Sequence, residues 1–267
     1  MDRIEKAMEK AQLHTKKGLK DITTIGEKPK KIEITYTQTQ VQELNQEELI
    51  QRRIIAQQKY SPEASIFKML RTKVLKQLRD NNWNSLAVTG ATQGAGKSMV
   101  AVNLAIAMAM EVNQTVLLVD LDLKYPKVHW YFDFQVKAGL KDYILSDIPL
   151  SDILINPAGI DRLVVLPGRG EASGSSEMVS GLKMQELVNE IKSRYKSRII
   201  IFDMPPVLAA DDVLASMDYY DAALLVVEDG GNTAIEIKKS LKMLSGTNLL
   251  GTVLNKSENP PDHQSYY

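Results

Sequence analysis

The sequence has 267 residues, of which 44% are hydrophobic and 25% are charged, and its 33 basic residues balance its 33 acidic ones. These values are typical of a large globular domain with extensions. The lack of cysteine excludes disulfides and thiolate metal sites, and no stretch reaches the roughly 18 apolar residues of a membrane span, so we expect a soluble, cytoplasmic chain.

The first part of the chain, residues 1–60, predicts a helical extension with a linker. Apolar residues recur at helical spacing over 2–20, which predicts an amphipathic helix. The polar stretch 23–40 predicts a linker, and a second helical segment follows at 45–58. Residues 1–80 carry 17 lysines and arginines against 11 acidic residues, so this arm is basic. It is either solvated or a docking element for a partner or for anionic lipid.

Helices and strands alternate from Ser61 onwards. Ser61 and Pro62 are residue types preferred at a helix N-cap and at the first helical position, and they predict a helix over 61–80. Its expected apolar stripe consists of Ile66, Met69, Leu70 and Val74. Short apolar runs predict buried strands at 85–89, 115–120, 162–166, 198–203, 222–227 and 249–254. Helical segments at 97–111, 178–194 and 232–245 separate most of them.

This alternation predicts the fold class. Near-continuous apolar strands separated by helices indicate an α/β fold, with a doubly wound, mostly parallel sheet and helices on both faces. We expect one such domain over residues 61–255, with its site at the carboxyl ends of the strands.

The segment ATQGAGKS, residues Ala91 to Ser98, follows the first of these strands and opens a helix. It matches the phosphate-loop pattern G-x-x-x-x-G-K-[ST], with Ala91 in place of the first glycine. In such a loop backbone N–H groups surround the β-phosphate, Lys97 bridges the β- and γ-phosphates, and the Ser98 hydroxyl binds Mg²⁺. The pattern therefore predicts ATP and Mg²⁺ as cofactors. The predicted nucleotide-binding residues are Gly94, Ala95, Gly96, Lys97, Ser98 and Met99.

Three aspartates, Asp120, Asp122 and Asp203, stand at the carboxyl ends of two predicted strands. Asp120 and Asp122 are two residues apart, so we expect both side chains on one face. Either all three carboxylates hold Mg²⁺ for ATP hydrolysis, or one of them acts as a base toward a protein hydroxyl. A tyrosine hydroxyl suits the second alternative, since its pKa of about 10 leaves a proton to be removed during transfer.

Four motifs in this order, ATQGAGKS, LLVDLDLKYPKVH, IIIFDMPPVLAADD and LLGTVLNK, resemble those of the bacterial tyrosine kinases of exopolysaccharide and capsule synthesis. The resemblance implies a phosphate-loop NTPase related to the partitioning and septum-site ATPases. Thr92 stands where that branch carries an extra lysine, which weighs against it. The segments RIEKAMEKAQ and VLPGRG…SEMVSG resemble the soluble subgroup, whose membrane-spanning chain-length partner is a separate polypeptide.

The resemblance also implies a role for each site residue. Asp120 would be the catalytic base, and Asp122 would help to hold Mg²⁺ and to position Lys97. Asp203 would be an outer-shell ligand of Mg²⁺, and Asn255 would contact adenine, unless it merely caps a strand end.

Self-association is a further implication, through a helix face that includes Lys68 and Arg71. Here Ser65 stands where relatives carry a glutamate, which puts a closed ring in doubt, and a simply solvated face is the alternative. Lys124 also departs from the pattern, since it replaces an arginine and loses bidentate geometry.

Residues 256–267 predict a flexible tail that ends in Tyr266 and Tyr267. By resemblance these tyrosines are phosphorylated in trans by a neighbouring copy, although an idle tail is the alternative. The favoured function is an ATP-dependent protein-tyrosine autokinase that regulates polysaccharide polymerisation or export. The alternatives are an ATPase switch without phosphotransfer and a nucleotide-binding adaptor of the polysaccharide machinery. We expect recruitment to the inner face of the membrane by a partner, and no nucleic-acid partner.

Overall fold

The computed structural model describes residues 39–58, 61–111, 113–146, 148–193, 198–209 and 211–258. The helix predicted over 2–20, nearly all of the predicted linker, and both Tyr266 and Tyr267 lie outside these residues. The chain divides into two compact units, Met1–Glu33 and Ile34–Tyr267, and only the second contains described residues.

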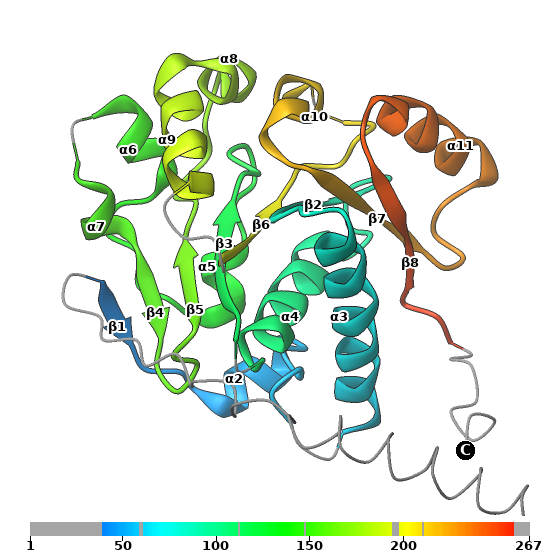
Figure 1. Cartoon of the computed structure of the whole chain (residues 1–267), viewed down its shortest axis with the longest axis horizontal. Coiled ribbons are helices and arrows are strands. Elements are labelled where there is room, and N and C mark those ends of the chain that lie inside the picture. Colours follow the sequence, from blue (N-terminus) through cyan, green and yellow to red (C-terminus); the bar gives the residue numbers. More distant parts are fainter. Residues whose placement is uncertain are drawn as a thin grey trace, which may run out of the picture. The chain divides into compact units, whose positions relative to one another are not determined.

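The described residues of this second unit form an eight-stranded sheet with the order β1-β4-β5-β3-β6-β2-β7-β8 (Figure 1). Neighbouring strands are parallel except for the pair β4 and β5. The strands are β1 (Gln40–Gln42), β2 (Ser85–Gly90), β3 (Thr115–Asp120), β4 (Ile155–Pro157), β5 (Leu163–Leu166), β6 (Arg198–Asp203), β7 (Ala222–Glu228) and β8 (Leu249–Asn255). The six predicted strands are confirmed, and β1 and β4 are additional.

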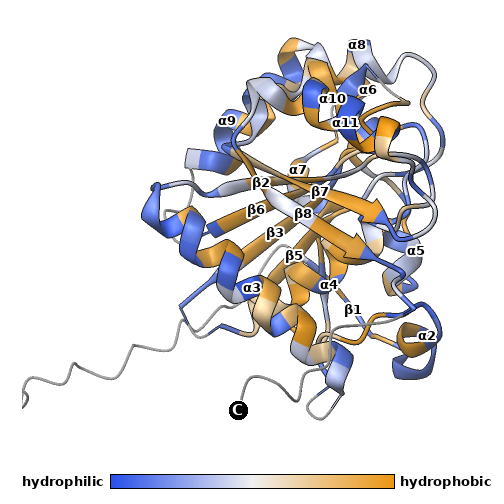
Figure 2. Cartoon of the chain, turned by 90° about the vertical axis from the view of Figure 1, so that its right-hand side faces the viewer, coloured by the Kyte–Doolittle hydropathy of each residue, from blue (hydrophilic) through white to orange (hydrophobic). Residues whose placement is uncertain are grey.

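Helices cover both faces of the sheet. They are α2 (Gln46–Gln51), α3 (Pro62–Asp80), α4 (Lys97–Ala109), α5 (Val128–Phe132), α6 (Leu140–Leu145), α7 (Leu150–Ile153), α8 (Ser175–Ser180), α9 (Leu182–Ser193), α10 (Asp212–Ala215) and α11 (Ala234–Met243). One apolar cluster joins α2–α5 to one face, and a second joins α6–α11 to the other. The apolar strands lie between these layers in Figure 2. This arrangement confirms the predicted doubly wound α/β fold.

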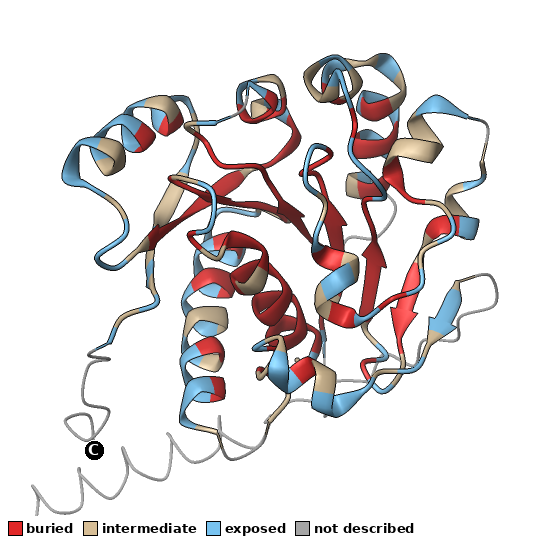
Figure 3. Ribbon diagram, turned by 180° about the vertical axis from the view of Figure 1, so that it is seen from behind, coloured by how far each residue is buried: buried red, intermediate tan, exposed pale blue. Residues whose placement is uncertain are grey.

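Helix α4 carries the phosphate loop at its start and is almost entirely buried, whereas α3 is buried along one side (Figure 3). Helix α3 begins as expected, because the Ser61 hydroxyl accepts a hydrogen bond from the backbone N–H of Ala64 at 3.2 Å. The expected apolar stripe is partly wrong, since Ile66 and Met69 are exposed. Val74 of the expected stripe is buried, and the other buried residues of α3 are Ala64, Phe67, Leu75 and Leu78, because the inward face follows the line of contact with α4.

The expected domain boundary near residue 60 is moved by the structure. Leu49, Ile54 and Ala56 are fully buried in the apolar cluster of α3 and α4, and β1 pairs with β4. The compact unit therefore starts well before Ser61, at Ile34. The predicted helix over 45–58 is also shorter, because the chain leaves α2 through Arg53, whose φ of 62° is left-handed.

Asn103, a fully buried residue of α4, fixes this N-terminal segment. Its Oδ1 accepts hydrogen bonds from the N–H groups of Ile55 and Ala56 at 2.9 and 3.0 Å, and its Nδ2 donates to the carbonyl of Arg53 at 3.0 Å. Three backbone groups of the segment thus depend on one side chain.

In the described part of the chain, no helix is long and apolar enough to cross a membrane.

Candidate functional site

The phosphate loop lies between β2 and α4, as predicted. Gly94 and Gly96 have φ angles of 88° and 92°, in the left-handed region that glycine adopts without strain. Such glycines let successive backbone N–H groups converge on an anion at the start of a helix. Position 96 requires glycine for a second reason besides its left-handed φ, because a Cβ atom there would lie 2.1 Å from Nδ2 of Asn255.

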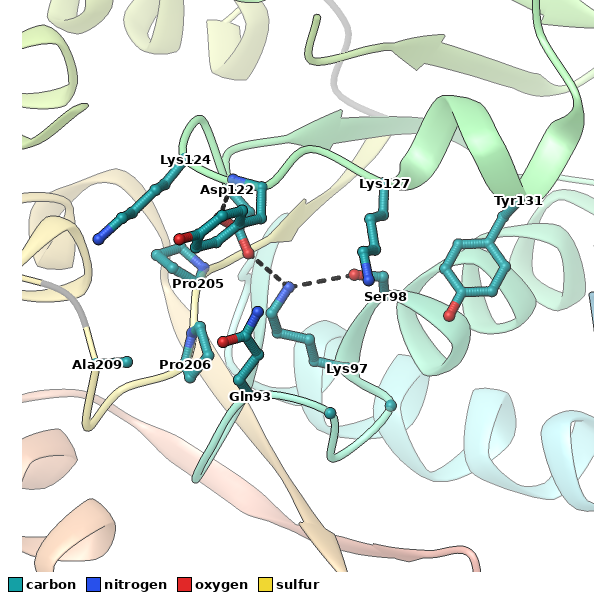
Figure 4. A pocket seen from close by; sticks show the side chains of 13 residues that line it. Gln93, Lys97, Ser98, Asp122, Lys124, Lys127, Tyr131, Pro205, Pro206 and Ala209 are labelled. Carbon is teal, nitrogen blue, oxygen red and sulfur yellow. Dashed lines mark hydrogen bonds and ion pairs between the residues drawn. The ribbon is translucent and has the colours of Figure 1, made fainter. Parts of the chain in front are cut away.

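Lys97 is the centre of the charged cluster in Figure 4. Its Nζ lies 2.8 Å from Oδ2 of Asp122, 3.7 Å from Oδ1 of Asp203 and 3.2 Å from Oγ of Ser98. Burial alone would lower the pKa of Lys97, but the carboxylates of Asp203 and Asp122 outweigh burial and raise it. The lysine is therefore held as a cation and faces the acids in this structure.

Asp122 and Asp203 reach this cluster from neighbouring strands. Asp203 ends β6, and Asp122 follows β3, where its Oδ1 accepts the backbone N–H of Tyr125 at 3.0 Å. Burial raises the pKa of Asp203 to about 6, although Lys97 beside it acts in the opposite direction. Both carboxylate oxygens of Asp203 are buried without a hydrogen-bond partner among the described residues.

Asp120 lies beside Asp203 in the sheet register, and both residues are fully buried. Oδ2 of Asp120 accepts the backbone N–H of Val128 at 2.9 Å, and its Oδ1 has no partner among the described residues. Burial, followed by the charge of Asp203, raises the pKa of Asp120 well above its usual range. Asp120 is the last residue of β3 and Asp122 lies beyond the strand; of the two, only Asp122 lines the cavity over the phosphate loop.

A cavity of about 300 Å³ lies over the phosphate loop (Figure 4). Gly94, Gly96, Lys97, Ser98 and Asp122 line it, together with residues that the sequence did not single out for this role: Gln93, Lys124, Tyr125, Lys127, Tyr131, Pro205, Pro206 and Ala209. Most of these follow the carboxyl ends of β3 and β6, which is the one signal that could have identified them.

The residues at this cavity fit a divalent cation bound together with phosphate. Ser98 supplies a hydroxyl and Asp122 a carboxylate at the cavity wall, and Asp203, which lies behind them near Lys97, has two buried oxygens without hydrogen-bond partners among the described residues. Among the described residues, no group of three or more His, Cys, Asp or Glu side chains could hold a metal ion, so a cation here would also need phosphate oxygens as ligands. This donor set suits Mg²⁺, which is usually bound by one or two carboxylates plus phosphate oxygens.

Three predicted nucleotide-binding residues lie away from the cavity wall: Ala95 within the loop, Met99 and Asn255. Met99 follows Ser98 in α4, and its sulfur accepts a hydrogen bond from Asn103 Nδ2 at 3.3 Å. Asn255 ends β8, and its Nδ2 donates to the carbonyl of Ala95 at 2.8 Å. Among described residues, none of the three is part of the cavity lining. The contact of Asn255 with adenine stays a prediction.

The two predicted oligomerisation residues, on α3, differ in their surroundings. Lys68 is partly exposed, whereas Arg71 pairs with Glu111 at 2.9 Å and donates to the carbonyl of Ala107 at 3.2 Å. Arg71 thus already binds the end of α4 within its own chain. Tyr266 and Tyr267 lie outside the described residues, so their role as acceptors stays a prediction.

Known proteins with the same architecture include bacterial tyrosine kinases. The putative tyrosine-protein kinase CapB of Staphylococcus aureus is 29% identical over 203 residues, which cover 75% of this chain and 86% of CapB. The solved chimerical protein CapA2B2 superposes with a TM-score of 0.72 at 28% identity, covering 78% of this chain and 91% of that one. The kinase domain of Escherichia coli tyrosine kinase ETK gives 0.68 at 27% identity, with 78% and 82% covered.

These similarities confirm the resemblance that the sequence motifs indicated. The family model described as the CobQ/CobB/MinD/ParA nucleotide binding domain matches residues 86–267, which contain the phosphate loop and all three aspartates. The chain belongs to the CobQ/CobB/MinD/ParA nucleotide-binding domain family.

Proposed function

We propose that the chain is an ATP-dependent protein-tyrosine autokinase. The observation that carries this proposal is the cluster in which Lys97 and Ser98 of the phosphate loop meet Asp122 and Asp203. The similarity to proteins named tyrosine-protein kinases supports tyrosine as the acceptor.

In this proposal the loop residues 94–98 hold the β- and γ-phosphates of ATP through their backbone N–H groups. Lys97 turns from the acids toward the phosphates, and its positive charge offsets the charge of the transferring group. Ser98, Asp122 and Asp203 would hold Mg²⁺, which would neutralise part of the charge of the phosphates.

The tyrosine oxygen attacks the γ-phosphorus, the bond from phosphorus to the ADP oxygen breaks, and the tyrosine proton passes to a carboxylate. We assign that carboxylate to Asp120, whose raised pKa favours accepting a proton. Because Asp120 does not line the cavity here, this role requires a rearrangement that opens its carboxylate to the cavity; Oδ1, which has no hydrogen-bond partner among the described residues, is the oxygen that would take the proton.

The acceptors we propose are Tyr266 and Tyr267 of a neighbouring copy. A tail of twelve residues after Asn255, at about 3.3 Å per residue, reaches up to roughly 40 Å, which is enough to enter another subunit's site. Phosphorylation would then change self-association, and with it polysaccharide polymerisation or export. A separate membrane-spanning chain-length protein is the proposed partner that brings the chain to the membrane.

The test is incubation of the purified chain with labelled ATP and Mg²⁺, alone and with the cytoplasmic segment of that partner. We expect phosphotyrosine in the wild type, none in Lys97→Met, and a normal level in Lys238→Met, which removes an exposed lysine of α11. The double variant Tyr266→Phe with Tyr267→Phe should lose most phosphotyrosine and keep ATP binding. Release of free phosphate without phosphotyrosine would instead establish an ATPase switch, and binding without turnover an adaptor.

A further inference from the structure

Asn255 contacts the phosphate loop from the outside. It is the last residue of the edge strand β8, and its Nδ2 donates to the carbonyl oxygen of Ala95 at 2.8 Å. The amide group occupies the space where a side chain of residue 96 would lie, since a Cβ on Gly96 would come within 2.1 Å of Nδ2. The side chain is therefore packed against the loop peptide.

This hydrogen bond fixes the direction of one loop N–H group. The peptide between Ala95 and Gly96 is planar and trans, so its C=O and its N–H point in opposite directions. When Asn255 holds the carbonyl of Ala95 outward, the N–H of Gly96 points to the opposite side of the peptide. The left-handed φ of Gly96 then continues the chain into α4 with the N–H groups of Lys97 and Ser98 free to bind an anion.

Asn255 is itself held firmly. Its carbonyl accepts the N–H of Asp229 at 2.9 Å, and Lys256 pairs with Glu228 at 2.8 Å. The start of the loop has a similar support, because Nδ2 of Asn232 donates to the Thr92 hydroxyl at 2.7 Å. Side chains from the β7 and β8 region thus support the loop at two points.

We propose that Asn255 is a positioning residue of the phosphate loop, which acts on the phosphate groups through the Ala95 peptide and not through adenine. The proposal rests on nucleotide binding by the family and does not depend on which acceptor receives the phosphate. Asn255 is not among the described residues that line the cavity, which is consistent with an indirect role.

The experiment compares two ligands, Mg-ATP and Mg-tripolyphosphate, in displacement of a fluorescent ATP analogue. We expect Asn255→Ala to weaken both by the same factor of about fivefold, the effect of losing one hydrogen bond. Asn255→Leu, which keeps the size of the side chain but not the donor, should weaken both equally as well. The matched control is Asn248→Ala at the other end of β8, where Nδ2 donates to the carbonyl of Asp221 at 2.8 Å.

The ratio of the two affinities shows whether the phosphate groups or adenine are affected. The thermal stability of each variant without ligand is measured in parallel, because a general structural defect would lower it. A variant that loses affinity for ATP and keeps its affinity for tripolyphosphate would overturn the proposal in favour of adenine recognition. Unchanged affinity for both ligands would overturn it too. If the wild type binds both ligands and transfers nothing to tyrosine, the kinase proposal fails while this one still stands.

Discussion

The Nζ of Lys97 lies 2.8 Å from Oδ2 of Asp122, so the lysine of the phosphate loop forms an ion pair within its own chain. Phosphate and carboxylate therefore compete for the same ammonium group. Of the two partners only Lys97 belongs to the loop, and Asp122 comes from the segment after β3. We therefore expect a nucleotide that binds through Lys97 to weaken this pair.

Asp122→Asn should separate binding from chemistry. Without the competing carboxylate, affinity for ATP measured without Mg²⁺ should rise by about three- to tenfold, while autophosphorylation with Mg²⁺ falls by at least tenfold. Asp152→Asn changes the same charge at an exposed site and should change neither. A loss of ATP affinity without Mg²⁺ would contradict the competition.

Gly168 packs on Asp120 and tolerates no side chain. A Cβ at position 168 would lie 2.4 Å from Cβ of Pro126 and 3.2 Å from the Asp120 carboxyl. Gly168→Ala should therefore cost about 1–3 kcal/mol in the free energy of unfolding and lower autophosphorylation by displacing Asp120. Denaturant titration provides the measurement. Gly246→Ala, whose Cβ would meet nothing closer than 3.9 Å, is the control, and equal effects of the two changes would refute the prediction.

Asn103→Ala should loosen the N-terminal segment. It leaves the partly buried N–H group of Ile55 and the buried N–H group of Ala56 without partners, at a cost of about 3 kcal/mol in the free energy of unfolding. Amide hydrogen exchange should rise most in residues 53–58. Asn189→Ala, an exposed change on α9, should leave exchange there as it was. If Asn103→Ala instead raises amide exchange equally across the whole sheet, the destabilisation is global and the prediction is wrong.

Asp221 should make the stability of the chain sensitive to acid. Burial would raise the pKa of Asp221, but hydrogen bonds from Lys192, Asn84 and Ser85 outweigh burial and lower it. A lowered pKa in the folded state means that this contribution is complete above about pH 4 and is lost as the pH falls below that value. Asp221→Asn should lower the free energy of unfolding by roughly 2 kcal/mol at pH 7. Below pH 4 the variant should lose less additional stability than the wild type does. Urea titrations at pH 3 to 7 measure the free energy of unfolding of the wild type and of the variant. If this free energy changes with pH by the same amount in both proteins, Asp221 is not the source of the acid sensitivity.

Lys68 and Arg71 should differ when each is replaced by alanine. Arg71→Ala breaks the contacts with Glu111 and Ala107 and should lower thermal stability, because a partly buried pair is lost. Lys68→Ala should leave thermal stability unchanged and weaken self-association, as measured by sedimentation at several concentrations. If Lys68→Ala leaves sedimentation unchanged while Arg71→Ala abolishes self-association without loss of stability, the division of roles is wrong.

Sequence patterns located the six long strands because their runs are apolar throughout, and the phosphate loop because glycine spacing there reflects backbone geometry. They could not locate β1, since QVQ is a polar edge strand of three residues that depends on pairing with β4. The buried face of α3 was misassigned at Ile66 and Met69 for a similar reason, because side-chain apolarity does not say which face the neighbouring helix contacts.

The site shows the same division. Strand-end positions brought Asp122 and Asp203 to Lys97 as expected, because parallel strands end at one edge. The burial of Asp120 depends on Val128 and Gly168, which are distant contacts without a local signal. The same holds for the placement of Asn255 against Ala95, across 160 positions of sequence.

The hydrogen bonds of Asn103 connect the N-terminal segment to the nucleotide site through helix α4. Asn103 and Lys97 belong to the same helix, α4. A displacement of residues 53–56 is therefore transmitted through Asn103 to the helix whose first turn carries the phosphate loop. A shortened chain that starts at Ser61 would therefore not lose a passive leader. It would strip α4 of the backbone groups that Asn103 binds, and uncover the apolar surface now covered by Leu49, Ile54 and Ala56.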